Sequence, residues 1–124
     1  MIRLALALLI AAACSLSAAE PIREIKNAKE FDAALASATG IVIVDFHAEW
    51  CPPCKELGPI LEAAVKENPD KVTLLKVDVD QNPELSKRFS ITSIPAVYRF
   101  KDGKQTATKV GFMDKAAVAA FIGL

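Results

Sequence analysis

Two runs of apolar residues dominate the middle of the chain, at 41–46 (IVIVDF) and 72–79 (VTLLKVDV). Both are rich in β-branched residues and lack the strict alternation that marks a strand with one solvent-exposed face. Continuous runs of this kind are typical of strands covered by helices on both faces of a sheet. The pattern therefore predicts two central strands of an α/β protein.

Shorter strands are expected where alternation or turn signals occur. The segment 22–26 (IREIK) alternates, as an edge strand does, and a strand over 96–100 is followed by the pair Asp102-Gly103. This dipeptide is a strong hairpin signal, so a return strand is predicted over 105–110. With the two central runs, these segments predict a sheet of five strands.

Apolar residues recur at helical spacing between these strands, which predicts four helices in the order β-α-β-α-β-α-β-β-α. Asparagine or aspartate is expected to cap two of the helices, and proline to open, kink or end others. Glycine is expected to end the first helix. These residues are, in chain order, Asn27, Gly40, Pro59, Pro69, Pro83 and Asp114.

The N-terminal segment 1–19 has a pattern of its own. Arg3 supplies one positive charge, residues 4–13 are purely apolar, and Ser17-Ala18-Ala19 offers a cleavage site with small residues. This order predicts a secretory signal peptide, with 20–124 as the mature domain. The uncharged stretch is shorter than the roughly 20 residues that span a bilayer, which disfavours a permanent anchor helix.

Cys14 leaves a second processing route open. Residues 11–14 (AAAC) resemble a bacterial lipobox, although leucine is more usual at the place of Ala11. A lipoprotein signal would end before Cys14 and leave that cysteine lipidated; otherwise it is an apolar filler in a discarded peptide. On both routes the protein is exported, to the periplasm in a bacterium. The domain then keeps Cys51 and Cys54 in an oxidising compartment, where an unpaired thiol is a liability.

Composition and charge narrow the class of partner. Hydrophobic residues make up 52% of the chain and charged residues 24%, which favours one packed domain over disorder. The formal net charge is zero, so neither nucleic acid nor an anionic membrane surface is expected as a partner. Contact with a membrane is expected only if Cys14 is lipidated.

The segment 49–59 (EWCPPCKELGP) carries the candidate chemistry. A zinc site needs four ligands, or three and a water, and Cys51, Cys54 and His47 would have to recruit carboxylates, so no metal is expected. A purely structural Cys51–Cys54 disulfide would close too small a loop to remove much entropy from the unfolded chain. The favoured interpretation is a redox-active pair at the start of a helix.

A helix that begins at or just after Cys51 presents free N–H groups and about half a positive charge to that sulfur. This setting stabilises a thiolate and lowers the thiol pKa from about 8.5. We therefore expect Cys51 to be the exposed nucleophile that attacks a disulfide in a partner protein. Cys54, one turn into the helix, is expected to be more buried and to resolve the mixed disulfide.

The motifs of the chain resemble those of the thioredoxin family, in the same order, over essentially all of 22–124. They are VDFHAEWCPPCK at 44–55, Pro59, KVDVDQNP at 76–83, SIPA at 93–96, FKDG at 100–103 and KVG at 109–111. The resemblance implies a thioredoxin fold, which is an α/β fold with a central mixed β-sheet flanked by helices on both faces. It also implies no cofactor beyond a redox-active Cys51–Cys54 disulfide.

The resemblance implies roles for three further side chains. Asp45 matches a family aspartate that lies beneath the resolving cysteine and assists its proton transfer, and burial would raise its pKa. The alternative is a partly exposed edge acid. Lys76 matches a lysine that can neighbour this acid, or it is a solvated surface lysine. Trp50 matches an exposed tryptophan beside the cysteines, or it is a core tryptophan.

A second set of residues is implied to bind substrate. Pro95 matches a family cis proline next to the cysteines, with an ordinary trans turn proline as the alternative. The backbone of its neighbour Ile94 would hydrogen-bond an extended substrate segment. Gly111 would lie close by, where a side chain would block docking. Pro53 and Trp50 complete the set.

Three positions depart from the family pattern: Pro52 replaces the usual glycine, His47 the usual tryptophan and Ala96 the usual threonine. Pro52 removes an N–H near the thiolate, which should make the pair more reducing. His47 shares a strand face with Asp45 and, if protonated near the thiolate, would act in the opposite direction. The alternative is a filler histidine in contact with solvent.

The expected function is that of a periplasmic thiol–disulfide oxidoreductase that reduces protein disulfides, because the Ile94-Pro95 pair resembles that of reducing thioredoxins. A reductase in an oxidising compartment needs electrons, so a membrane-bound thiol reductant is the expected donor. The alternatives are a disulfide oxidase or isomerase, a thioredoxin for cytochrome c maturation, and a non-catalytic binding module of the same fold. The protein is expected to be a monomer.

Overall fold

The computed structural model describes residues 20–124. The predictions of a signal peptide and of a lipidated Cys14 lie outside the described residues. Helices and strands follow one another in the predicted order. Their bounds are β1 Ile22–Glu24, α1 Ala28–Ser37, β2 Ile41–His47, α2 Pro52–Glu67, β3 Val72–Asp78, α3 Pro83–Arg88, β4 Ala96–Lys101, β5 Lys104–Val110 and α4 Lys115–Ile122.

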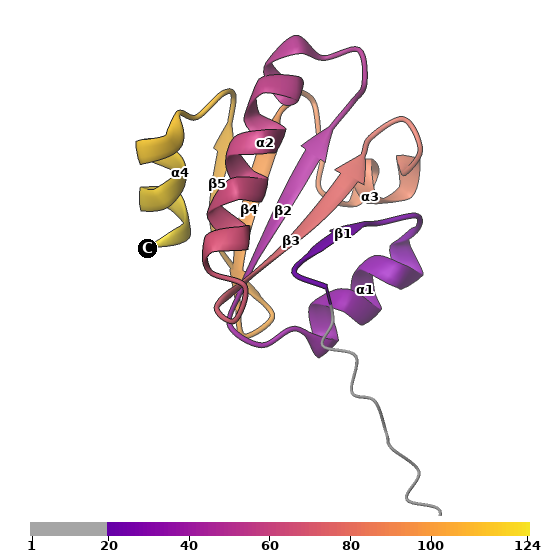
Figure 1. Ribbon diagram of the computed structural model, residues 1–124. Helices are drawn as coiled ribbons and strands as arrows, with labels where there is room; N and C mark the ends of the chain where they lie inside the picture. Colours follow the sequence, from indigo (N-terminus) through magenta and orange to yellow (C-terminus); the bar gives the residue numbers. More distant parts are fainter. Residues whose placement is uncertain (1–19) are drawn as a thin grey trace, which may run out of the picture.

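The five strands form one mixed sheet in the order β1-β3-β2-β4-β5 (Figure 1). β3 is parallel to both β1 and β2, whereas β4 runs antiparallel to β2 and to β5. β2 and β3 therefore have a neighbouring strand on each side and helices above and below. This position explains why their apolar runs are nearly continuous, and it confirms the predicted fold class.

Helices cover both faces of the sheet, and each face has its own core. α1 and α3 pack on one face, where Phe31 of α1 meets alternate residues of the central strands. α2 and α4 pack on the other face, where Leu61 of α2 meets Ile43 of β2. Because side chains alternate along a strand, Asp45 and His47 follow Ile43 onto the face covered by α2.

Side-chain caps begin two of the helices, as the sequence predicts. The Asn27 side chain accepts a hydrogen bond from the Glu30 N–H at 2.8 Å at the start of α1. Asp114 accepts one from the Ala117 N–H at 2.8 Å at the start of α4. Each cap satisfies a donor that the helix itself leaves free.

The prediction that Gly40 ends the first helix was wrong. α1 ends at Ser37, and the next residue, Ala38, is already extended. Gly40 has a φ of 82°, and an added Cβ would lie 2.7 Å from the Lys71 carbonyl oxygen. The glycine is needed where the chain enters β2, because the Ile41 N–H donates to that same carbonyl at 3.0 Å.

The turn residues and the prolines lie at the turn and helix positions that the sequence predicts. Asp102 and Gly103 join β4 to β5 with φ angles of 52° and 75°. Two consecutive residues in the left-handed region are what a two-residue type I′ turn requires. Pro83 is the first residue of α3, and Pro59 lies inside α2. The kink expected at Pro59 stays a prediction.

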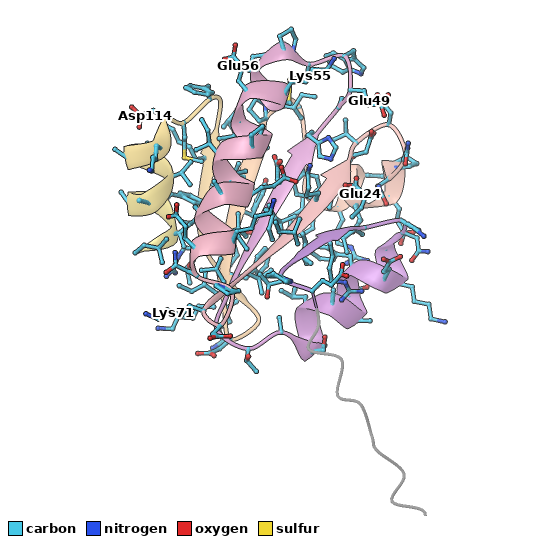
Figure 2. The ribbon with its side chains drawn as sticks, in the orientation of Figure 1. Glu24, Glu49, Lys55, Glu56, Lys71 and Asp114 are labelled. Carbon is cyan, nitrogen blue, oxygen red and sulfur yellow. A yellow bond between two sulfur atoms is a disulfide. The ribbon has the colours of Figure 1, made fainter. Side chains whose placement is uncertain are left out.

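Charged side chains lie outside the layers. Figure 2 shows Lys55 and Glu56 near the first turn of α2 and Lys71 in the loop before β3, and all three are exposed. Within residues 20–124, no helix combines the length and the apolar character needed to cross a membrane. Asp45 and Asp78 are buried exceptions to this arrangement, and Asp45 lies on the face of β2 that α2 covers, whereas Asp78 ends β3.

Candidate functional site

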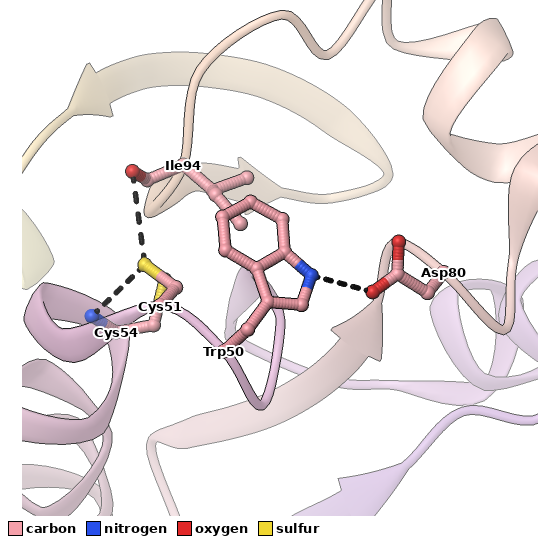
Figure 3. Close-up of a disulfide and its surroundings, with 5 residues drawn as sticks. All are labelled: Trp50, Cys51, Cys54, Asp80 and Ile94. Carbon is pink, nitrogen blue, oxygen red and sulfur yellow. Dashed lines mark hydrogen bonds between the residues drawn. A yellow bond between two sulfur atoms is a disulfide. The ribbon is translucent and has the colours of Figure 1, made fainter.

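Cys51 and Cys54 lie at the start of α2, directly after the loop that leaves β2, and are joined by a disulfide (Figure 3). Cys51 is the N-cap residue, and its Sγ accepts a hydrogen bond from the Cys54 N–H at 3.3 Å. The Lys55 N–H donates to the Cys51 carbonyl at 3.2 Å and closes the first turn. The Cys51 sulfur thus takes the place that a serine or aspartate oxygen occupies at other helix starts.

Pro52 and Pro53 occupy the first two positions of α2. A helix leaves its first N–H groups without internal partners, and proline has no N–H at all. Among residues 52–54, only Cys54 keeps a backbone donor, and that donor is directed at Cys51 Sγ. The double proline therefore leaves the sulfur with one hydrogen bond from the first turn of the helix.

The expectation that Cys51 is exposed and Cys54 more buried was wrong for the disulfide form. The two residues are 4% and 5% exposed, so burial does not distinguish them. Both pack with Ala48 in a small cluster that Val79 and Ile94 flank. The local pattern around the cysteines could not predict this cover, because it comes from loops that are distant in the chain.

The loop before β4 lies against the disulfide. The Ile94 carbonyl oxygen is 3.9 Å from Cys51 Sγ, and the Ile94–Pro95 peptide bond is cis. The Pro95 carbonyl accepts a hydrogen bond from the Gly111 N–H at 2.8 Å, which holds the end of β5 beside this loop. Gly111 has a φ of 101°, and a Cβ added there would meet open space. Within the part of the chain that the structure describes, no side chain therefore covers the backbone of Gly111, which is held next to the Ile94–Pro95 loop.

Trp50 directly precedes Cys51 and lines a pocket together with Ile94. The residue is 67% exposed, so it is not a core tryptophan. The indole Nε1–H donates to Asp80 Oδ2 at 2.7 Å, which ties the ring to the loop after β3 (Figure 3). Pro53 is also exposed at this end of α2. Sequence reasoning did not identify Asp80, because an acid in a loop carries no periodic signal.

Asp45 is 1% exposed beneath α2, so it is not an edge acid. Burial raises the pKa of its carboxyl from 3.8 to about 6, while the charges of His47 and Lys76 lower it by less. Asp45 and Cys54 line the same cavity of about 280 Å³. A carboxyl with this pKa beside a cysteine can exchange a proton with it near neutral pH.

Lys76 lies in register with Asp45 across β2 and β3, and with Glu24 across β1 and β3. Its Nζ is 3.4 Å from Glu62 Oε1 on α2, and both side chains also line the cavity. The lysine is therefore a strand neighbour of the buried acid, and its ion pair is with Glu62. Sequence reasoning did not identify Glu62, which follows the ordinary polar spacing of α2.

His47 lines the same cavity at the end of β2. Its side chain is 17% exposed, and its Nε2 lies 3.4 Å from Glu24 Oε1 on β1. This is an ion-pair distance, although the geometry does not make a hydrogen bond. His47 thus stands between the buried Asp45 and an acid at the surface.

The site as a whole is suited to thiol–disulfide exchange. Within residues 20–124, no group of three or more His, Cys, Asp or Glu side chains is arranged to hold a metal ion. On one side of the disulfide lies an accessible rim, which consists of Trp50 and the backbone of Ile94 and Gly111. On the other side lies the buried carboxyl of Asp45, which can accept a proton. These are the parts that the exchange reaction uses.

Comparisons with known proteins agree with this chemistry. A model of the thioredoxin family matches residues 23–123. Thioredoxin from Chlamydia trachomatis is 48% identical over 85 residues, which cover 68% of this chain and 82% of that protein. Thioredoxin from Rickettsia bellii is 43% identical over 94 residues, which cover 76% and 90%. The structure of Plasmodium falciparum thioredoxin matches with a TM-score of 0.74 at 34% identity, covering 82% of this chain and 96% of that one.

Proposed function

The chain belongs to the thioredoxin family and is a thiol–disulfide oxidoreductase, and we propose that it reduces protein disulfides outside the cytoplasm. Thioredoxins act on protein disulfides and need no cofactor beyond the active-site disulfide. The observation that supports reduction at this site is the position of the Cys51–Cys54 disulfide. It lies at the start of α2, beside a rim that carries Trp50 and the backbone of Ile94 and Gly111.

In the proposed reaction the Cys51 thiolate attacks one sulfur of the substrate disulfide, and a first substrate thiolate leaves. The Cys54 thiol gives its proton to Asp45, attacks Cys51 Sγ and releases the second substrate thiolate. The enzyme dithiol loses two electrons as its disulfide forms, and the substrate disulfide gains them. Cys51 is the proposed nucleophile because its sulfur receives the Cys54 N–H and lies at the positive end of α2.

Repeated turnover requires a donor that returns two electrons to the Cys51–Cys54 disulfide. An oxidising compartment holds no thiol pool that would do so. The proposed donor is therefore a membrane-bound thiol reductant that exchanges with the same disulfide. The proposed substrates are protein disulfides that reach the rim beside Trp50.

The extracytoplasmic location is proposed from residues 1–19 alone. The intact mass of protein purified from its host tests it. Cleavage after Ala19 would leave residues 20–124, whereas the lipoprotein route would leave a chain that begins at a lipidated Cys14. Recovery of only the unprocessed chain from the host would contradict export by either route.

The proposed activity can be measured as the turbidity that develops when insulin disulfides are reduced, with dithiothreitol as the electron donor. The wild-type protein is expected to accelerate insulin reduction, and Cys51→Ala is expected to remove the acceleration. An equal rate for both proteins would overturn the proposal. The redox state in the host separates a reductase from an oxidase, because a reductase is held mostly as the dithiol.

Trapping with Cys54→Ala identifies the substrates and the electron donor. Without the resolving thiol, mixed disulfides through Cys51 are expected to accumulate and to release their partners on reduction. The Cys51→Ala/Cys54→Ala double variant is the control and should capture none of them. Capture that is equal for the two variants and insensitive to reductant would instead identify a non-catalytic binding module. Apocytochrome as the main partner would place the protein in cytochrome c maturation.

A further inference from the structure

A group of charged and titratable side chains lies behind the disulfide, and the exchange reaction proposed above uses only one member of it, the buried Asp45. Residues from α2, from β2 and its following loop, and from β3 line the cavity of about 280 Å³ beside Cys54. The titratable and charged groups among them are Asp45, His47, Glu49, Lys55, Glu62 and Lys76. Glu24 approaches from β1 through its contact with His47.

Exposure increases stepwise from the interior of this group to the surface. Asp45 is 1% exposed, and the side chains of His47 and Glu24 are 17% and 52% exposed. Asp45 and His47 share one face of β2, and two residues along a strand correspond to about 7 Å. Glu24, on the far side of β3, then meets His47 Nε2 at 3.4 Å. The three side chains form a path from the cavity to solvent.

Two polar atoms on this path lack hydrogen-bond partners among the described residues, although both are buried. They are Asp45 Oδ1 and His47 Nε2. A buried polar atom without a partner is costly and is uncommon unless it has a function or binds water. The cavity is large enough to hold water molecules that would join the carboxyl to the imidazole.

We propose that His47 is a proton relay, which carries the proton that Asp45 takes from Cys54 to Glu24 and then to solvent. The inference rests on the proposed function, because it concerns the resolution step of the same exchange reaction. His47 is a positioning and relay residue that acts through Asp45, and it does not touch the substrate.

The protons and electrons of the step balance. Cys54 gives its proton to the Asp45 carboxylate, its thiolate forms the bond to Cys51 Sγ, and the bond from Cys51 to the substrate breaks. The electron pair leaves with the substrate thiolate, which is protonated by solvent. Asp45 then passes its proton through cavity water to the His47 imidazole, which passes a proton to Glu24, and Glu24 releases it to solvent. Asp45 and His47 return to their starting states.

The two lysines that line the cavity do not fit this role. The Lys76 ammonium lies 3.4 Å from Glu62 and, while it is protonated, it has no lone pair with which to accept a proton. Lys55 is exposed and also cationic. Histidine is the side chain that takes up and releases a proton near neutral pH. Lys76 therefore contributes positive charge to the site, whereas His47 can accept a proton and release it again.

Rapid-quench measurement of the two steps tests the relay. A peptide disulfide is mixed with the reduced protein, and the mixed disulfide through Cys51 is followed as it forms and decays. His47→Gln is expected to leave formation within about twofold of wild type. It is expected to slow decay about tenfold at pH 7, which is less than the roughly 10²–10⁴-fold of direct general acid–base catalysis because His47 acts through Asp45. The difference should shrink at pH 9, where hydroxide removes the Cys54 proton.

Chemical rescue separates a relay from a structural role. In His47→Ala, added imidazole is expected to restore most of the lost decay rate, which a purely structural histidine would not allow. Glu24→Gln should slow decay less than His47→Gln, with Glu67→Gln, at the exposed far end of α2, as its matched control. Decay of the mixed disulfide at the wild-type rate in His47→Gln, or loss without rescue in His47→Ala, overturns the relay. Absence of any mixed disulfide in the wild-type protein would instead overturn the proposed function.

Discussion

At the scale of single residues, Asp45 connects folding stability with chemistry. Its carboxyl is buried beneath α2, and burial raises its pKa from 3.8 to about 6. The folded protein therefore binds this proton more tightly than the unfolded chain does. Stability is highest while the group is protonated in both states, and it falls as the pH rises from about 4 to about 6. Above that range the whole cost of the buried charge is present.

Replacing Asp45 by asparagine removes the charge at nearly constant size. Moving a pKa from 3.8 to about 6 costs about 3 kcal/mol once the carboxyl is ionised. Asp45→Asn is therefore expected to raise the free energy of unfolding of the oxidised protein by about 3 kcal/mol at pH 8, and by almost nothing at pH 3.5. Urea denaturation over a series of pH values measures this difference.

Asp70→Asn, at an exposed acid in the loop before β3, is the control and should show no such pH-dependent gain. An equal gain for Asp45→Asn at both pH values would contradict the assignment of the cost to ionisation. The variant should also slow reduction of insulin, because it removes the proposed proton acceptor for Cys54.

At the scale of secondary-structure elements, the start of α2 determines how well a Cys51 thiolate is solvated. The helix places its positive end at this sulfur, yet two of its first three residues are prolines. The Cys54 N–H remains as the donor from this turn. The same turn therefore combines a favourable dipole with a reduced number of hydrogen bonds.

Pro52→Gly restores a backbone N–H at the first position of α2. A hydrogen bond to a charged group is worth about 1.5–3 kcal/mol, so the pKa of the Cys51 thiol is expected to fall by about one to two units. A gain of about 1.4 kcal/mol in the stability of the reduced form would raise the reduction potential by about 30 mV. Alkylation rates as a function of pH and equilibration with glutathione measure the two quantities.

Pro83→Gly is a matched control, because Pro83 is the first residue of α3 and lies away from the disulfide. It should change neither the thiol pKa nor the potential. An unchanged Cys51 pKa in Pro52→Gly would show that the restored N–H does not reach the sulfur.

The entry to β2 depends on a close approach between two backbones. Gly40 combines a left-handed φ with a Cβ position 2.7 Å from the Lys71 carbonyl oxygen. Gly103 in the hairpin has a similar φ, but a Cβ there would meet open space. Gly103→Ala should therefore cost about 1 kcal/mol from the backbone alone, and Gly40→Ala about 2–3 kcal/mol. Chemical denaturation compares the two variants, and equal losses would exclude the steric contact.

At the scale of the whole molecule, the sequence predicts the layers well and the contacts between loops poorly. Continuous apolar runs predict β2 and β3 as inner strands, and Asp114 is predicted as a cap because its signal is local. The cover over Cys51 comes from Ile94, a residue 43 positions away, so the expected exposure of that cysteine was wrong. The role of Gly40 at the entry to β2 cannot be predicted from the sequence, because the Lys71 carbonyl that it approaches is distant in the chain.

The site shows the same division between local and distant information. Asp45 and His47 could be placed on one strand face from their spacing. Glu24 and Glu62 could not be identified, because their roles depend on strand order and on how α2 lies over the sheet.

The two edges of the sheet bear on self-association. β1 is three residues long, and β5 carries exposed Lys104 and Lys109. Short and charged edges resist pairing with another sheet, so the protein is expected to be a monomer. Sedimentation at a protein concentration of 0.1 mM tests this, and a wild-type dimer would contradict it. Lys104→Val/Lys109→Val should associate, whereas Lys29→Val/Lys66→Val, on exposed helix positions, should not.

Trp50, whose exposed ring is held by Asp80 beside the disulfide, is the single tryptophan of the chain. Its fluorescence therefore comes from one known place in the molecule. A disulfide quenches an excited indole on contact, so emission should rise when the Cys51–Cys54 bond opens and fall when it closes. The protein carries its own optical reporter, and each half of the catalytic cycle can be timed by fluorescence without a label.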